Sequence, residues 1–571
     1  MKKGFWVLIW LCFSFKIDYP PFISYPPVFT LVAPVRDELS ITGSFGELRN
    51  NHFHGGIDIR SARGIHGDDI LSAGDGYISK IIIDSDEYGK SMYISHPNGL
   101  VTFYAHLRDF RKDISDYIKA KQYEQERFQI SLDFDPDDFP VKGGEHLAYM
   151  GNTGASRGKH LHFEVRNAKD DEVWDPTHFG LPIKDDIAPT IRRIKVYGYD
   201  GNGNDISSKV YSKTQIDQAS VPLEISGDVF SVGLDALDRS DNSWNYTGIK
   251  SIQLFIDGGM FYHFSADNWK RNDTKYINAH IDFGAKSASK GQFHRCFLLS
   301  GNKMNVYLSV QNDGFFYMSD TLAHEVKVIA GDANGNQSEV NFKIQRKDYQ
   351  FSKISSKYQD ILYHDRDKIF ATQNAILKFQ TGSVYEDLNC ELRKHSNPNK
   401  NCFSDWIGII PSNEPVHLSS EIRLKPEKVI PDAYRDKCFV AIQRGNGYLS
   451  VGGTWEGEEL VSYARSLGPF CIALDTVAPF IKASLNRKKA FPKNQLVFKI
   501  SDNVNTSREI PDIYYEARID GQWVLMEYDK KSASIRHHFE DWLGKGKHQY
   551  EILVRDYLGN QRTYKGNFVR S

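Results

Sequence analysis

Two stretches in the C-terminal part of this chain carry the same three short motifs in the same order, which restricts both stretches to one type of fold. In the first copy the motifs are Asp186–Pro189, Ile256–Gly258 and Asp332–Gln337. In the second copy they are Thr476–Pro479, Ile519–Gly521 and Asp556–Gln561. A strand-like run precedes the last motif in each copy, and the turn that follows favours glycine at Gly335 and Gly559. The pattern predicts two immunoglobulin-like β-sandwiches, at residues 186–349 and 475–571.

Between the two copies, residues 350–474 contain further strand-like runs, and we interpret them as a β domain of uncertain type. The first copy is longer than the second, so inserted loops are expected within it. Residues 186–571 contain no cluster of side chains that would be typical of a catalytic site.

The N-terminal region, residues 30–185, is rich in glycine and histidine and contains short alternating runs such as Tyr77–Ile83, broken by turn signals. These runs predict antiparallel strands. Apolar residues at helical spacing near Ile114 and Ile118 predict a helical insertion at 108–140, with a helix at 110–118 that borders the cleft. With 13% aromatic residues, the chain is expected to be ordered and mainly β.

The first residues resemble a secretory signal peptide, because Lys2 and Lys3 precede a short apolar run that ends before Lys16. We therefore expect a signal peptide at 1–16 and an exported protein, in the periplasm or cell envelope. A lesser alternative is a lipid anchor on Cys12. Another is that these apolar residues form a buried N-terminal strand or helix of the folded protein. Export would allow one or two disulfide bridges among the cysteines within 390–471, with Cys296 a buried thiol.

The balance of charge argues against nucleic acid as a partner. Lys and Arg number 71 against 73 Asp and Glu, so the chain lacks the basic excess of a polyanion-binding protein.

Three motifs in the N-terminal region contain side chains suited to metal chemistry. His54 and Asp58 flank two glycines, a spacing that favours a loop leading into a strand. In His160–Val165 the strand period of two places both histidines, His160 and His162, and Glu164 on one face. His106 follows a third strand-like run. Each histidine alone is more often structural, but together they are typical of a metal site.

Zinc explains why these residue types would be needed together. A catalytic Zn²⁺ takes three nitrogen or oxygen ligands and leaves a fourth position for water, whose pKa falls toward about 7. Two histidines and one aspartate match that ligand count, and further histidines could move protons or hold a developing oxyanion.

Residues 35–180 resemble the M23 (LytM/lysostaphin-like) metallopeptidases, which cut peptide cross-links in bacterial peptidoglycan. The resemblance rests on ordered motifs at His54–Asp58, Tyr104–Leu107, Gly151–Gly154 and His160–Glu164, with supporting segments at Gly67–Gly76 and Val141–Glu145. It implies an antiparallel β-sheet peptidase domain in which His54, Asp58 and His162 bind Zn²⁺ and His106 and His160 are catalytic. Glu164 receives no catalytic role from it. The sequence departs from the family at Lys159, where the family usually has proline, and in the insertion at 108–140. Neither departure removes a ligand.

We therefore expect an exported zinc metalloendopeptidase that hydrolyses peptide cross-links of peptidoglycan without a covalent enzyme intermediate. Two alternatives stay open. One is a non-catalytic LytM-like regulator or cell-surface binding protein that recruits another wall hydrolase; the other is a surface adhesion or scaffold protein whose C-terminal sandwiches do the main work and whose peptidase is vestigial. The C-terminal β domains could contact a cell-envelope protein partner, and the sequence leaves the oligomeric state and the ligand of these domains undetermined.

Overall fold

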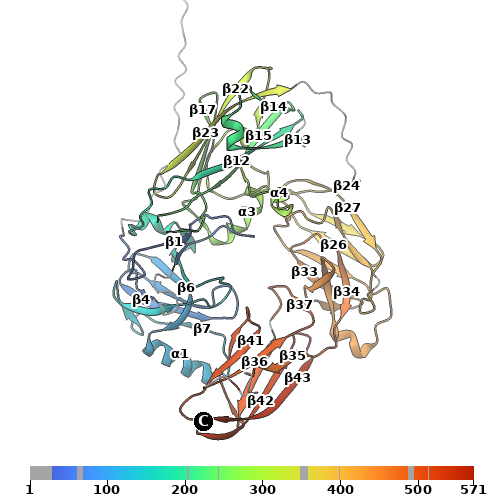
Figure 1. Ribbon diagram of the computed structural model, residues 1–571. Helices are drawn as coiled ribbons and strands as arrows, with labels where there is room; N and C mark the ends of the chain where they lie inside the picture. Colours follow the sequence, from blue (N-terminus) through green and yellow to red (C-terminus); the bar gives the residue numbers. More distant parts are fainter. Residues whose placement is uncertain are drawn as a thin grey trace, which may run out of the picture.

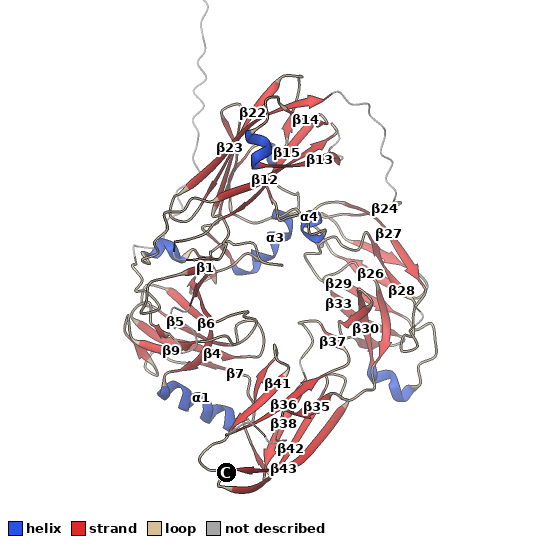
Figure 2. Ribbon diagram, in the orientation of Figure 1, coloured by secondary structure: helices blue, strands red, loops and turns tan. Residues whose placement is uncertain are grey.

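The computed structural model describes residues 29–60, 68–201, 203, 205–241, 243–347, 358–397, 399–485, 491, 494–511 and 513–570. The expected signal peptide, residues 1–16, and Cys12 lie outside these ranges. Most of the described chain forms antiparallel strands, so the prediction of a mainly β protein is confirmed. Its four parts follow one another around a closed ring (Figures 1 and 2).

The N-terminal part is built on one sheet, in which β10 lies between β2 and β6. Strand β10 pairs antiparallel with both neighbours, and His162 stands opposite Asp58 on β2 and Ala105 on β6. The strands of this part are β1 (Ile41–Gly43), β2 (Ile57–Arg60), β3 (Asp69–Leu71), β4 (Gly76–Ile83), β5 (Lys90–Ser95), β6 (Leu100–Phe110), β7 (Ile130–Asp133), β8 (Pro140–Val141), β9 (His146–Met150), β10 (His160–Asn167) and β11 (Glu172–Trp174).

The insertion expected at 108–140 is helical only in its middle. Helix α1 spans Lys112–Glu124 and buries Ile114 and Ile118, while β6 continues to Phe110 and β7 and β8 return the chain to the sheet. Tyr117 on the same helix is 41% exposed. The strand that contains His106 extends further than the sequence indicated. The backbone is left-handed at His106 (φ 61°), and pairing with β9 continues the strand beyond it.

Residues 190–347, which contain the first copy of the repeat, form two sheets. A segment inserted in this copy also contributes a strand, β18, to the N-terminal sheet. Strand β18 pairs with β11, so the N-terminal sheet has twelve strands within the described residues, and both parts share one hydrophobic core. The strands are β12 (Thr190–Tyr199), β13 (Asp205–Ser212), β14 (Leu223–Ser226), β15 (Val229–Leu237), β16 (Ser251–Ile256), β17 (Gly259–Ser265), β18 (Asn268–Lys270), β19 (His294–Arg295), β20 (Tyr307–Val310), β21 (Phe316–Tyr317), β22 (Ala323–Gly331) and β23 (Gln337–Lys347).

Short helices connect these strands. They are η1 (Pro176–Phe179), α2 (Lys213–Asp217), η2 (Arg271–Tyr276), α3 (Ile277–His280), α4 (Phe283–Ser287) and η3 (Asn312–Gly314).

Residues 360–474 form two sheets around a separate core. Their elements are β24 (Asp360–Leu362), β25 (Lys368–Ala371), β26 (Ala375–Phe379), β27 (Leu388–His395), β28 (Trp406–Ile410), β29 (Ser420–Leu424), η4 (Asp432–Lys437), β30 (Cys438–Arg444), β31 (Gly447–Ser450), β32 (Thr454–Glu456), β33 (Glu459–Ala464) and β34 (Phe470–Leu474). The five cysteines among the described residues are buried thiols, so the expected bridges are not formed here. The Sγ atoms of Cys402 and Cys471 lie 3.6 Å apart.

The last part contains two four-stranded sheets around one core. Their strands are β35 (Phe480–Ala483), β36 (Gln495–Ser501), β38 (Tyr514–Ile519), β39 (Gln522–Trp523), β40 (Glu527–Asp529), β41 (Ser534–His538), β42 (Gly546–Arg555) and β43 (Gln561–Arg570). Strand β37 (Asn505–Thr506) pairs parallel with β31 and so adds a strand to a sheet of the preceding part. Both copies of the repeat use the same turns: Gly335 and Gly559 have φ 92° and 80°, as a left-handed turn position requires.

The ring closes where the last part meets the N-terminal part. The carboxylate of Glu540 accepts a hydrogen bond from Tyr123 on α1, and Trp523 packs edge-on against the Tyr123 ring. Lys530 forms an ion pair of 2.7 Å with Asp86. No helix among the described residues has the length and apolar composition needed to cross a membrane.

Candidate metal centre and its histidines

The local fold brings the first two motifs together on the central strands. Asp58 lies on β2, and the loop before β2 presents His54 four residues earlier. A Cβ atom at Gly56 would collide with the carbonyl oxygen of Phe163 on β10, so glycine allows the two chains to approach closely there. Leu161 and Phe163 are fully buried in the core, and His162 between them faces Asp58.

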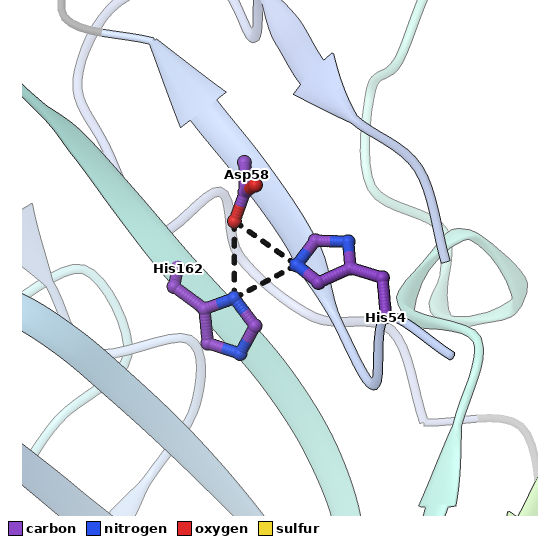
Figure 3. A group of neighbouring side chains, drawn as sticks. All are labelled: His54, Asp58 and His162. Carbon is purple, nitrogen blue, oxygen red and sulfur yellow. Dashed lines mark hydrogen bonds and ion pairs between the residues drawn. The ribbon is translucent and has the colours of Figure 1, made fainter. Parts of the chain in front are cut away.

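His54, Asp58 and His162 form a tight buried triangle (Figure 3). The Asp58 Oδ1 atom lies 3.1 Å from His54 Nε2 and 3.0 Å from His162 Nδ1. The two facing imidazole nitrogens are themselves 3.0 Å apart. The three residues that the sequence predicts as ligands therefore converge on one point.

The outer nitrogen of each of these two imidazoles already has a hydrogen-bond acceptor. His54 Nδ1 lies 2.8 Å from the carbonyl oxygen of Ser44, and His162 Nε2 lies 2.7 Å from Glu164 Oε1. When both rings are neutral, protons on these outer nitrogens leave lone pairs on His54 Nε2 and His162 Nδ1, the two atoms that face Asp58. This arrangement is the one that metal-binding histidines adopt, with a carbonyl or carboxylate behind each ring.

His106 and His160 line the same site from the other side. Their ring centroids are 4.8 Å apart, and His160 Nε2 lies 3.5 Å from Asp58 Oδ1. Each ring again has a carbonyl behind Nδ1, from Thr153 at 2.9 Å and from Gly158 at 2.8 Å. All five residues predicted for the site are therefore gathered in one place.

Burial and neighbouring charges change the pKa values of these groups. Burial lowers the pKa of His106 to about 3, with contributions from His162 and His160, so His106 is neutral at pH 7. Burial opposes the ionised form of Asp58, but its three histidine neighbours outweigh it and hold the pKa of Asp58 well below the usual range. Burial likewise lowers the pKa of His162, but Asp58 and Glu164 outweigh it and raise the value to about 9.

The sequence patterns did not identify Arg49, whose Nη2 donates a 2.7 Å hydrogen bond to Asp58 Oδ2. This oxygen is not the one that contacts the histidines, since their contacts with Asp58 are all made to Oδ1. A second buried pair, Arg166 and Glu164 at 2.7 Å, holds the carboxylate behind His162. Arg49 reaches Asp58 through the tertiary fold, whereas Arg166 continues the period of two of His160, His162 and Glu164 on β10, so the strand pattern could have identified it.

The donor set fits a zinc ion. Zinc prefers imidazole nitrogen and carboxylate oxygen, and a catalytic site has three such ligands with one position open. The facing lone pairs of His54 and His162, together with the Asp58 carboxylate, would repel one another without a cation or a proton between them. The chemistry of these residues therefore suits the metal that the resemblance implied.

Comparisons with known proteins agree with this geometry. Residues 52–123 match the model of peptidase family M23, and residues 359–475 match the model of a Zu5-like domain. The chain is 30% identical over 119 residues to the DD-carboxypeptidase/endopeptidase Mpg of Neisseria meningitidis serogroup B, covering 21% of each chain. It is 30% identical over 135 residues to the cell division protein DipM of Caulobacter vibrioides, covering 24% of this chain and 18% of that one.

A zinc-containing peptidase from Vibrio cholerae is 24% identical, over 24% of this chain and 36% of that one, with a TM-score of 0.17. The chain thus spans about a fifth of the length of the curated relatives it matches. The matched stretch includes His54, Asp58 and His106, and the family match comes from residues 52–123. The resemblance of the N-terminal part to peptidase family M23 is thus confirmed by the family match at residues 52–123.

Proposed function

We propose that the chain is an exported zinc metalloendopeptidase that hydrolyses peptide cross-links of bacterial peptidoglycan in the periplasm or cell envelope. The observation that carries the proposal is the convergence of His54, Asp58 and His162 within 4.8 Å, each imidazole with a hydrogen-bond acceptor behind it. The match of residues 52–123 to peptidase family M23 supports the substrate class.

In this proposal His54, Asp58 and His162 hold the metal. When bound, zinc supplies Lewis-acid chemistry, which polarises a peptide carbonyl and makes water a better nucleophile at neutral pH. Arg49 and Glu164 orient two of the three ligands from behind. Because Arg49 neutralises part of the Asp58 charge, we expect it to tune the affinity of the site as well as its geometry.

His106 and His160 move the protons. The Nδ1–H group of His106 donates a hydrogen bond to the carbonyl oxygen of Thr153. The ring is neutral at pH 7, so its Nε2 atom can accept a proton. A proton taken there from the attacking water converts the ring to an imidazolium. The imidazolium can stabilise the oxyanion and then pass the proton to the leaving amine when the amide C–N bond breaks. His160, which lies beside His106, would also help to stabilise the oxyanion.

The remaining parts position the catalytic part. We propose that residues 186–349 and 475–571 are immunoglobulin-like modules and that these domains, with the Zu5-like region, contact a cell-envelope protein. Their placement around the ring, with the last part against the N-terminal part, supports a role in controlling access to the wall.

The test is digestion of purified sacculi by the chain lacking residues 1–16, followed by mass spectrometry of the muropeptides. We expect zinc-dependent loss of cross-linked muropeptides and new amino termini that identify the bond. A chelator should abolish this loss, and added Zn²⁺ should restore it. His54→Ala should lower the rate by at least about 100-fold, since it removes a ligand.

His395→Ala is the matched control, because His395 is exposed on β27, in a different part of the chain, and should retain full activity. A zinc-loaded protein that leaves several types of sacculi unchanged would contradict the proposal. That result would favour the alternative in which the chain regulates another wall hydrolase.

A further inference from the structure

Two clusters of three aspartates occupy equivalent positions in the two copies of the repeat, far from the histidine site in the sequence. In each copy one aspartate lies in the linker that enters the module, and the other two directly follow a strand. The clusters are Asp185, Asp238 and Asp332 in the first copy and Asp475, Asp502 and Asp556 in the second. The strands concerned are β15 and β22 in the first copy and β36 and β42 in the second.

The turn that carries the last aspartate is built identically in both copies. In the first, Asn336 donates from its backbone N–H and its side-chain amide to the two carboxylate oxygens of Asp332, both at 2.8 Å. The same amide donates to the backbone carbonyl of Asp185 at 2.9 Å. One asparagine thus fixes the turn carboxylate and the linker relative to each other.

Asn560 makes the equivalent contacts in the second copy. It donates to both oxygens of Asp556 at 2.8 Å and to the carbonyl of Asp475 at 3.1 Å. The linker aspartates are also alike: Asp185 accepts from the N–H of Ile187 and Asp475 from that of Val477. The two clusters are therefore the same local structure, present twice.

Five of the six carboxylates are buried and Asp502 is half-buried, yet three of them keep an oxygen without a hydrogen-bond donor. Asp238 and Asp475 are 5% and 3% exposed, and each retains a carboxylate oxygen with no hydrogen-bond donor; Asp502 retains one as well. Among the described residues, no lysine or arginine forms an ion pair with any of the six aspartates. Buried polar groups left unsatisfied are rare in proteins and indicate a missing partner.

The electrostatics agree with a missing cation. Burial, reinforced by Asp332 and Asp185, raises the pKa of Asp238 to about 7. Burial raises the pKa of Asp502 to about 6, and Asp475 and Asp556 contribute. Like charges held close together in a buried place oppose ionisation unless a cation lies between them.

The geometry suits one ion at each cluster. In each cluster the three ligand oxygens lie within 4.8 Å of one another. Oxygens that bind one Ca²⁺ at about 2.3–2.6 Å are at most about 5 Å apart. A cavity of about 30 Å³, lined by Asp185, Asp238 and Ala333 among others, adjoins the first cluster. That volume accommodates an ion or a water molecule.

We propose that each module of the repeat binds one divalent cation of the Ca²⁺ class, held by its linker, loop and turn aspartates. The all-oxygen ligand set selects a hard cation and excludes the zinc chemistry of the histidine site. Because the first ligand of each cluster belongs to the linker, the ion ties the module to the part of the chain that precedes it. The two cations fix the junctions at residues 185 and 475.

The test is equilibrium binding of Ca²⁺ to the chain lacking residues 1–16, after chelation and removal of the chelator. We expect two Ca²⁺ per chain. Asp238→Asn and Asp502→Asn should each bind one, and the double variant none. His54→Ala should still bind two, which separates these sites from the histidine site. Asp365→Asn, in an exposed group of acidic residues and paired with Arg366, is the acidic control and should bind two.

A stability measurement distinguishes an ion site from a structural role of the aspartates. Without Ca²⁺, Asp238→Asn and Asp502→Asn should unfold at the same temperature as the unmodified protein or higher, because each substitution removes a repelling charge. With Ca²⁺, the unmodified protein should gain thermal stability and each variant should gain less. Binding of no Ca²⁺ by the unmodified protein, or retention of two by both variants, would overturn the proposal, as would variants that are destabilised equally with and without Ca²⁺.

Discussion

At the scale of single residues, the groups behind the proposed metal ligands determine how well these side chains are oriented. Glu164 accepts the Nε2 proton of His162 and is held by Arg166, so it fixes the ring with Nδ1 facing Asp58. In Glu164→Gln the side-chain shape is kept but the charge is lost. We expect the Kd for zinc to rise about 10–100-fold, measured by competition with a chromophoric chelator.

Glu339→Gln, an exposed change on β23, is the control and should leave the Kd unchanged. An unaltered zinc affinity in Glu164→Gln would contradict a positioning role for Glu164 and leave it as a packing residue.

The residues of the site that can be predicted from sequence are those whose spacing carries information. His160, His162 and Glu164 alternate along one strand, and His54 with Asp58 spans two glycines, so a short pattern is sufficient. Arg49 cannot be found in this way, because its contact with Asp58 depends on how the loop before β2 folds back. The aspartate clusters are hidden for the same reason: the turn motifs at Asp332 and Asp556 are visible, but their partners are far away in the sequence.

At the scale of elements, strand β10 connects the core to the site. Leu161 is fully buried on the face opposite the histidines. Leu161→Ala removes apolar contacts and leaves a cavity, so we expect a loss of about 2–5 kcal/mol in the stability of the N-terminal part. Hydrogen exchange at β2 and β6 should speed up. Val569→Ala, at a side chain 67% exposed, should change stability by less than about 0.5 kcal/mol.

The hairpins of the two repeat copies share an aspartate–histidine pair whose pH dependence can be measured. His548 Nδ1 lies 2.7 Å from Asp520, and this hydrogen bond raises the pKa of His548. The stabilisation from the raised pKa is complete below about 6.5 and is lost as the pH rises through the folded-state value. Hydrogen bonds from the Gln549 N–H and from His548 lower the pKa of Asp520, so its contribution is lost in acid.

Histidine hydrogen exchange followed by mass spectrometry reports the pKa of His548 directly. We expect a value above the ordinary one, and Asp520→Asn should return it toward about 6.5. An unshifted value in the unmodified protein would show that the pair does not form in solution.

Element boundaries were predicted less well than element types. The strand at 100–103 was expected to end near His106, yet β6 continues to Phe110, because pairing with β9 and β5 stabilises it past the left-handed residue. Strand β18 could not have been expected, because it is three residues long and forms only through pairing with β11. Local patterns cannot reveal pairing between distant segments.

At the scale of the whole molecule, the ring places the last part of the chain beside the N-terminal part that contains the histidine site. Lys531 donates to the backbone carbonyls of Asn152 and Ser156, in the loop that leads to His160. Lys531→Glu would repel these carbonyls and loosen the contact. If the proposed function holds, hydrolysis of intact sacculi should rise at least about two-fold, while hydrolysis of a short soluble peptide should change little.

Hydrogen exchange of residues 151–158 gives a readout that is independent of activity, and it should speed up in Lys531→Glu. Lys565→Glu, an exposed charge reversal on β43, is the control. Equal effects on both substrates would contradict a role of the last module in access. The repeat motifs give no indication of the ring, because exposed ion pairs such as Lys530 with Asp86 leave no sequence pattern.

The pairing of β18 with β11 also determines where the chain can be divided. A fragment that stops at residue 185 would expose the backbone N–H and C=O groups along the free edge of β11. It would also uncover Phe45 and Phe53, which pack against Trp269. Such a fragment is expected to self-associate during expression. The smallest soluble unit that contains the histidine site should therefore extend to Lys347, at the end of β23.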